Sequence, residues 1–154
     1  MTTASPNRQP VAIALDVGDV RIGVAISRSG VIAEPLQTVE RLGRSQVLDA
    51  LQRIVEESGA TLCVVGLPLL EGGAEGEQAE KTRAFARSMA RRFPALKIEW
   101  WDERHSSGAA RGHAGRRADG DRGLIDRIAA AVILQEYLDD QSEKKRRQQG
   151  DSGT

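Results

Sequence analysis

The chain has 154 residues, of which 40% are hydrophobic and 29% are charged, and its formal net charge is zero. This length gives one domain with a buried core and is too short for two ordinary domains. No apolar run approaches the roughly 18 residues of a membrane span, and residues 1–10 lack the apolar segment of a signal peptide, so we expect a cytoplasmic protein. The single cysteine, Cys63, lies in an apolar run, which excludes a disulfide within the chain and zinc-thiolate chemistry.

The N-terminal half predicts three antiparallel strands, one helix and one buried strand. Residues 1–10 are polar and contain two prolines, so we expect them to be disordered. Apolar residues alternate over 11–27 around a break at Gly18 and Asp19, which predicts a β-hairpin. Residues 31–39 predict a third strand, placed at an edge or bulged by Pro35. Apolar residues at helical spacing predict a helix over 44–58, and the wholly apolar residues 61–66 predict a parallel strand after a crossover.

The C-terminal half continues the alternation of helices and strands. A polar loop over 71–76 precedes a helix that ends at Pro94, and residues 96–101 predict the fifth strand. Residues 112–123 predict a glycine-rich mobile loop, 124–139 a final helix, and 140–154 a charged disordered tail. We therefore predict an α/β domain over 11–139, with a mixed five-stranded central sheet of three antiparallel and then two parallel strands, flanked by helices.

Three acidic residues occupy positions that local structure alone does not fully explain. Asp16 follows five apolar residues at the end of the first strand, where an Asx-type turn is the alternative to a functional role. Asp126 shares the apolar face of the final helix, although a carboxylate in a first turn also favours the helix dipole. Glu103 follows the fifth strand, and functional groups gather at the carboxyl ends of parallel strands in such sheets.

Carboxylates that converge on one pocket repel one another. They stay ionised at neutral pH most readily when divalent cations neutralise them, and hard oxygen ligands favour Mg²⁺ or Mn²⁺. Two such ions would activate water and stabilise the leaving oxygen in phosphodiester cleavage. Asp16, Glu103 and Asp126 are therefore the candidate catalytic and metal-binding residues of a nuclease.

Basic residues cluster although the total charge is zero. The segment 104–122 holds five arginines against two aspartates, which suits contact with nucleic-acid phosphates, and a solvated loop is the alternative. Arg21 also flanks the predicted pocket, where it either holds phosphate or pairs with the acids. The candidate nucleic-acid-binding residues are Arg21, Arg104, Arg111, Arg116, Arg117 and Arg122.

Five motifs in order resemble the YqgF/RuvX family and span about residues 11–139. They are D-x-G-x-x-R-I-G-V-A at 16–25, V-G-L-P-L at 65–69, E-x-x-x-A-E-K-x-R-x-F-A at 75–86, D-E-R at 102–104 and D-x-x-A-A-x-x-I-L at 126–134. The resemblance implies an RNase H-like, RuvC-like nuclease, either a Holliday junction resolvase or a nuclease that matures the 5′ end of precursor 16S rRNA. It also places the family's acidic triad on Asp16, Glu103 and Asp126.

The chain departs from the family pattern near the hairpin and in one loop. Val17 stands in place of the usual aromatic, Val20 in place of a basic residue, and Arg28 in place of an acid. The glycine-rich segment 112–123 stands where a segment rich in lysine and arginine is expected. Substrate contacts are therefore expected to differ from those of relatives, while the triad is intact.

Two other functions fit parts of the sequence. A phosphotransferase of the actin and sugar-kinase type shares the D-x-G hairpin, but it needs two related domains. A non-catalytic nucleic-acid-binding module needs only the basic segments and gains nothing from three acids near phosphates. The sequence leaves open branched DNA against precursor rRNA, monomer against homodimer, and the roles of His105, His113, Trp100 and Trp101.

Overall fold

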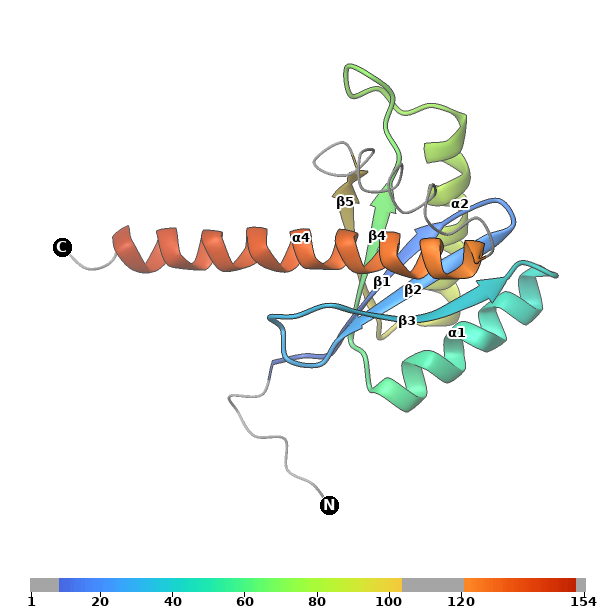
Figure 1. Cartoon of the computed structure of the whole chain (residues 1–154), viewed down its shortest axis with the longest axis horizontal. Coiled ribbons are helices and arrows are strands. Elements are labelled where there is room, and N and C mark those ends of the chain that lie inside the picture. Colours follow the sequence, from blue (N-terminus) through green and yellow to red (C-terminus); the bar gives the residue numbers. More distant parts are fainter. Residues whose placement is uncertain (1–8, 104–120, 152–154) are drawn as a thin grey trace.

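The structure is a computed structural model that describes residues 9–103 and 121–151. Five strands form one sheet in the order β3-β2-β1-β4-β5 (Figure 1). The pairs β1–β2 and β2–β3 are antiparallel, whereas β4 runs parallel to β1 and β5 parallel to β4, so the predicted mixed sheet is confirmed. The elements in chain order are β1 (Ala12–Val17), β2 (Arg21–Ser27), β3 (Glu34–Glu40), α1 (Arg44–Ser58), β4 (Leu62–Leu67), α2 (Glu77–Arg92), β5 (Lys97–Asp102) and α4 (Arg122–Asp151).

Helices cover both faces of the sheet, and the alternation along β1 explains which helix lies where. Ile13 and Leu15 point to the face covered by α1 and α2, whereas Ala12 and Ala14 point to the face crossed by α4 (Figure 1). The small alanine side chains let α4 pack closely through Ala130. The strand β1 is consequently buried on both faces at the centre of the molecule.

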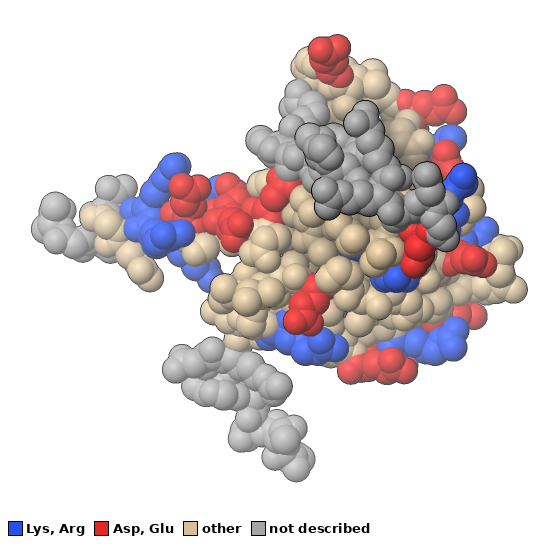
Figure 2. All heavy atoms as spheres, viewed as in Figure 1, with Lys and Arg blue, Asp and Glu red and all other residues tan. Residues whose placement is uncertain are grey.

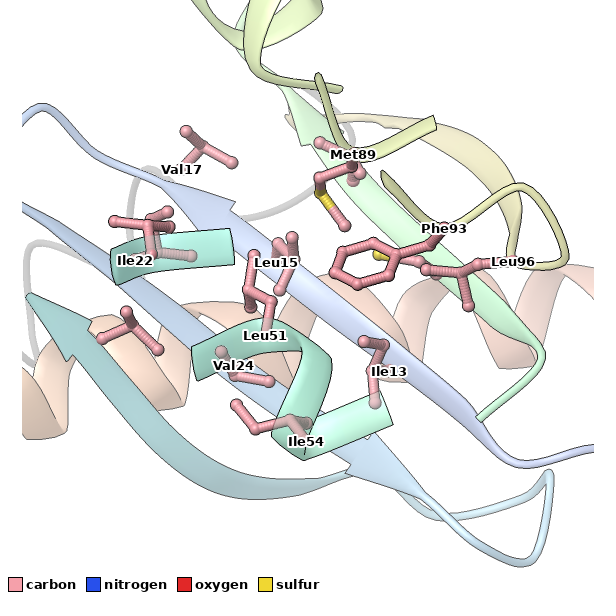
Figure 3. Packing of buried hydrophobic residues seen from close by; sticks show 14 of the residues in the cluster. Ile13, Leu15, Val17, Ile22, Val24, Leu51, Ile54, Met89, Phe93 and Leu96 are labelled. Atoms are coloured by element: carbon pink, nitrogen blue, oxygen red, sulfur yellow. The ribbon is translucent and has the colours of Figure 1, made fainter. Parts of the chain in front are cut away.

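The larger core lies between the sheet and the helix pair α1 and α2. Figure 3 shows Leu51 and Ile54 of α1 facing the side chains of β1 and β2, with Met89 of α2 at the other end of the cluster. Leu51 and Met89 are fully buried, and burial of a side chain of that size contributes about 1.5–3 kcal/mol. This core fixes the strands whose ends carry the acidic residues.

The edge strand β3 confirms the role predicted for Pro35. It lies at one edge of the sheet, and its register against β2 shifts between Val24 and Ala25, where Ala25 pairs with Pro35. The strand begins at Glu34, although a start at residue 31 was predicted. The difference arises because Ser29 Oγ accepts hydrogen bonds from the backbone N–H groups of Val31 and Ile32, which holds those residues in a turn.

The final helix is longer than predicted at both ends. It begins at Arg122 because the side chain of Asp121 accepts a hydrogen bond from the backbone N–H of Leu124 at 2.9 Å, the geometry of an N-terminal cap. It continues to Asp151, so the expectation of a disordered segment from residue 140 is wrong for 140–151, which are helical. Ion pairs one helical turn apart, Asp140 with Lys144 and Glu143 with Arg147, support this exposed end.

The free end of α4 extends away from the sheet and carries both basic and acidic side chains (Figures 1 and 2). Of the loop predicted over 112–123, residues 112–120 lie outside the described residues, as do most of residues 1–10. Across the part of the chain that the structure describes, no helix combines the length and the apolar character that crossing a membrane requires.

Candidate active site

Asp16 lies one residue before the end of β1, where the strand approaches the tight β1–β2 turn. Its partner across the antiparallel ladder is Gly23 of β2. Gly18 forms the turn itself, because its backbone N–H donates to the carbonyl oxygen of Arg21 at 3.0 Å and a Cβ at Gly18 would come within 2.7 Å of that oxygen. The turn thus fixes the backbone next to Asp16, which carries the carboxylate.

Asp126 reaches the same place because Gly23 has no side chain. A Cβ at Gly23 would overlap the backbone carbonyl of Asp126, so the first turns of α4 rest directly on the backbone of β2. No pattern in the sequence predicts this contact between a helix and a strand. Since Gly23 is the ladder partner of Asp16, the contact places the backbone of Asp126 over the strand next to Asp16.

Glu103 is placed by a second glycine. It follows β5, and its side chain lies over Gly66 of β4, where a Cβ would come within 2.5 Å of Glu103 Oε1 and 2.7 Å of Ile133 Cδ1. The strand β4 lies between β1 and β5 in the sheet, so a side chain that folds back over Gly66 points toward the end of β1. Gly66 therefore gives the carboxylate of Glu103 the room it needs.

The three acids line one cleft of about 340 Å³. Asp16 comes from β1, Asp126 from α4 and Glu103 from the end of β5, so the predicted convergence of residues far apart in sequence is observed. Their catalytic and metal-binding roles stay predictions. The other lining residues are Val17, Gly18, Asp19, Pro68, Gln78, Ile125 and Ala129.

Arg21 pairs with one of these acids. Its Nε donates to Oδ2 of Asp126 at 2.8 Å, and both side chains are about one quarter exposed. Of the two roles considered for Arg21, the structure therefore contains the ion pair. Among the residues that the structure describes, no three histidine, cysteine, aspartate or glutamate side chains are grouped closely enough to hold one metal ion.

The remaining residues that the sequence singled out divide into those that the structure describes and those that lie outside the described residues. Arg122 is the first residue of α4 and is exposed, outside the lining of the cleft. Trp100 and Trp101 pack on opposite faces of the sheet, as the strand alternation predicts. Outside the described residues lie Arg104, Arg111, Arg116, Arg117, His105 and His113.

Two polar residues that line the cleft were not predicted as site residues. Asp19 lies in the β1–β2 turn and Gln78 in the first turn of α2, and both line the cleft. Asp19 could have been found from the sequence, because the predicted turn between the two strands places it near Asp16. No local pattern indicated Gln78, because its place depends on how α2 packs against the sheet.

Comparison with known proteins identifies the family of the chain. The RuvX family, described as "Holliday junction resolvase", matches residues 10–140. A Synechocystis sp. protein named "Putative pre-16S rRNA nuclease" is 39% identical over 137 residues, which cover 86% of this chain and 90% of that protein. A protein of the same name from Crocosphaera subtropica is 41% identical over 132 residues, which cover 83% of this chain and 92% of that protein.

Solved structures show the same fold. The RuvC of T. thermophilus in complex with a Holliday junction substrate has a TM-score of 0.54 and 14% identity, and the match covers 84% of this chain and 94% of that chain. A second T. thermophilus RuvC structure also has a TM-score of 0.54, at 12% identity, over 86% of this chain and 96% of that chain. The RNase H-like fold predicted from the motifs is thereby confirmed, and the chain belongs to the RuvX family of nucleases.

Proposed function

We propose that this chain is a divalent-metal-dependent endonuclease that hydrolyses phosphodiester bonds at the cleft lined by Asp16, Glu103 and Asp126. The observation that carries the proposal is that these three acids, from three separate elements, line one cleft. Two glycines leave the space that two of these acids occupy, Gly23 for the backbone of Asp126 and Gly66 for the side chain of Glu103. A structural role for all three acids would not require such a concentration of negative charge.

The donor set suits a hard divalent cation. Asp16, Glu103 and Asp126 would supply carboxylate oxygens, which are the ligands of Mg²⁺ and Mn²⁺. When bound in a two-metal site, the ions would lower the pKa of a water nucleophile and neutralise charge on the cleaved phosphate. The described side chains are not grouped as a ligand set, and the Asp126 carboxylate is engaged by Arg21, so we infer that cation binding requires this carboxylate to turn from Arg21 or to share its oxygens.

The chain's own residues position the acids and the substrate. Asp16 is held by the ladder of β1 and β2, which limits its movement during the reaction. Arg21 fixes the carboxylate of Asp126 before substrate arrives, and its guanidinium can hold a substrate phosphate when that pair opens. Arg122, exposed at the start of α4, adds a positive charge on the same helix as Asp126. Arg104, Arg111, Arg116 and Arg117 are proposed to contact phosphates as well.

Branched DNA and precursor 16S rRNA are the two proposed substrates. The family description names junction resolution, and the similar proteins from Synechocystis sp. and Crocosphaera subtropica are named for pre-16S rRNA. Both substrates present the same phosphodiester group, so the carboxylate cleft suits either. Symmetric cleavage of a four-way junction would favour a homodimer, whereas trimming of an RNA end needs one copy. Either activity belongs in the cytoplasm.

The test is cleavage of three labelled substrates: a four-way DNA junction, a matched linear duplex and a precursor 16S rRNA fragment. Each is incubated with Mg²⁺ or Mn²⁺, and Asp16→Asn is the matched control because it keeps the side-chain shape and removes the charge. Cleavage that needs metal and is absent from Asp16→Asn supports the proposal, and the preferred substrate identifies the role. Equal cleavage by both proteins, or none by the wild type, contradicts it.

A further inference from the structure

We refer to the cleft lined by Asp16, Glu103 and Asp126 as the acidic cleft. A second cleft, of about 440 Å³, adjoins it. Asp19 of the β1–β2 turn lines both clefts, so the two share a wall. Figure 1 shows the β1–β2 turn and the beginning of α1 at the same edge of the molecule. Three basic residues and one acid supply the charge of the second cleft, whose lining consists of Asp19, Arg41, Gly43, Arg44, Val47, Lys81, Ala84 and Phe85. We refer to it as the basic cleft.

Arg41 is anchored toward the acidic cleft. Its Nη1 donates to the carbonyl oxygen of Gly18 at 2.7 Å, and its guanidinium carbon lies 5.4 Å from the centre of the Phe85 ring. A cation held over an aromatic face in this way keeps its charge and loses little freedom on binding a ligand. Arg41 is therefore a fixed positive charge beside the turn that follows Asp16.

Arg44 and Lys81 are less constrained. Arg44 is exposed and makes no ion pair with any residue that the structure describes, and the first turn of α1 contains no acid. Lys81 Nζ lies 3.9 Å from Asp19 and 3.6 Å from Glu77, and these exposed pairs are long and weakly stabilising. Both side chains are thus available to an anionic ligand without the loss of a strong interaction.

We propose that the basic cleft binds the phosphate backbone of a nucleic-acid strand whose neighbouring phosphate lies in the acidic cleft. This inference rests on the proposed function and extends it to substrate positioning. The shared wall at Asp19 favours a strand over an isolated anion, because a polymer can occupy both clefts at once. Contacts to the backbone fix the register of a substrate without reading its bases, so this cleft positions the strand in any sequence.

The experiment measures binding rather than cleavage. All variants carry Asp16→Asn so that the substrate stays intact, and binding to a fluorescently labelled four-way DNA junction and to a labelled single-stranded RNA is followed by anisotropy over a range of salt concentrations. The test variants are Arg44→Glu and Lys81→Glu. The matched control is Arg53→Glu, because Arg53 is exposed on the same helix as Arg44 and lies outside both clefts.

We expect each test variant to bind at least one of the two probes about five-fold or more weakly and to reduce the slope of log affinity against log salt by about one. Arg53→Glu should change affinity by less than about two-fold, and Arg44→Lys should keep most of the affinity. Arg44→Glu should also fold normally, because an acid in a first turn interacts favourably with the helix dipole. Circular dichroism checks this point for every variant.

Three results would overturn the inference. One is an equal loss of affinity in Arg53→Glu, since this would indicate a general effect of net charge. The second is unchanged affinity for both probes in Arg44→Glu and Lys81→Glu. The third is competition by inorganic phosphate that is as strong as competition by unlabelled nucleic acid at matched ionic strength. This would indicate a site for a single anion. A chain that binds through Arg44 and Lys81 but never cleaves would contradict the proposed function alone.

Discussion

Arg21 and Asp126 are 105 residues apart in the chain, yet Arg21 Nε and Asp126 Oδ2 lie 2.8 Å apart beside the acidic cleft. The pair joins β2 to α4 at the point where α4 rests on Gly23. The positive charge of Arg21 partly balances the negative charges of the acids in the cleft. The guanidinium thus competes with any cation that the carboxylate of Asp126 would bind.

Removal of Arg21 should strengthen cation binding. In Arg21→Ala the carboxylate of Asp126 loses its positive neighbour, and we expect the Mg²⁺ or Mn²⁺ concentration for half-maximal thermal stabilisation to fall by roughly three- to ten-fold. Arg21→Lys keeps the charge and should remain within about two-fold of the wild type. A higher metal requirement in Arg21→Ala would contradict this prediction and would indicate that Arg21 orients Asp126 for binding.

Gly23→Ala should destabilise the fold. The added methyl group meets the backbone carbonyl of Asp126, which no change of rotamer relieves, so α4 must shift from β2. Overpacking of this kind costs about 1–3 kcal/mol, and we expect Tm to fall by roughly 2–12 °C in a calorimetric scan. Gly150→Ala in α4 is the control, since nothing lies within 4 Å of a Cβ added there. A Tm equal to that of the control would show that α4 does not rest on Gly23.

Gly66→Ala should separate activity from stability. Here the new methyl group meets the ends of two side chains, Glu103 and Ile133, rather than backbone atoms. We expect Tm to change by less than about 3 °C. Displacement of the Glu103 carboxylate by about 1 Å should lower cleavage by about 100-fold. Parallel measurement of Tm and cleavage rate checks this, and full activity with a shifted Glu103 would exclude that residue from the reaction.

Burial raises the pKa of the Cys63 thiol from 9.0 to about 12. The folded protein therefore keeps a proton that the unfolded chain releases between these values, so this contribution to stability is complete below pH 9 and is lost as the pH rises toward 12. Urea unfolding at pH 8 and pH 10 should show a larger loss of stability in the wild type than in Cys63→Ala. An identical pH dependence in both proteins would contradict the burial of a protonated thiol.

The same burial makes Cys63 a reporter of global unfolding. Its side chain is fully buried in the core between the sheet and α2, so a thiol reagent should react with the native protein only as fast as the core opens. Reaction at pH 8 should be slow without denaturant and fast in urea above the unfolding midpoint. Rapid labelling of the native protein would mean that this part of the core opens locally.

The sequence predicted the strands well because their patterns are local. Each of these patterns depends on the surroundings of a single strand. The patterns are the alternation in β1 and β2, the wholly apolar sequence of β4 and the proline of β3. The rule that functional groups gather at the ends of parallel strands then placed Asp16 and Glu103 correctly in one cleft.

What the sequence did not predict depends on close approach between distant backbones. Gly23 accommodates the backbone of a helix about a hundred residues later in the chain, and no local pattern indicates this. The partner of Arg21 and the place of Gln78 follow from the same packing. The end of α4 was missed for another reason. Beyond Asp139 the helix has no apolar face to detect, and ion pairs along its own surface support it.

The projecting end of α4 is a suitable place to attach a label. Residues 142–150 are exposed, and at 1.5 Å per residue the twelve residues of 140–151 extend about 18 Å. None of them lines the acidic or the basic cleft. A fluorophore or a surface linkage attached there would leave both clefts open to solution, so single molecules could be watched on tethered DNA or RNA without disturbing the chemistry.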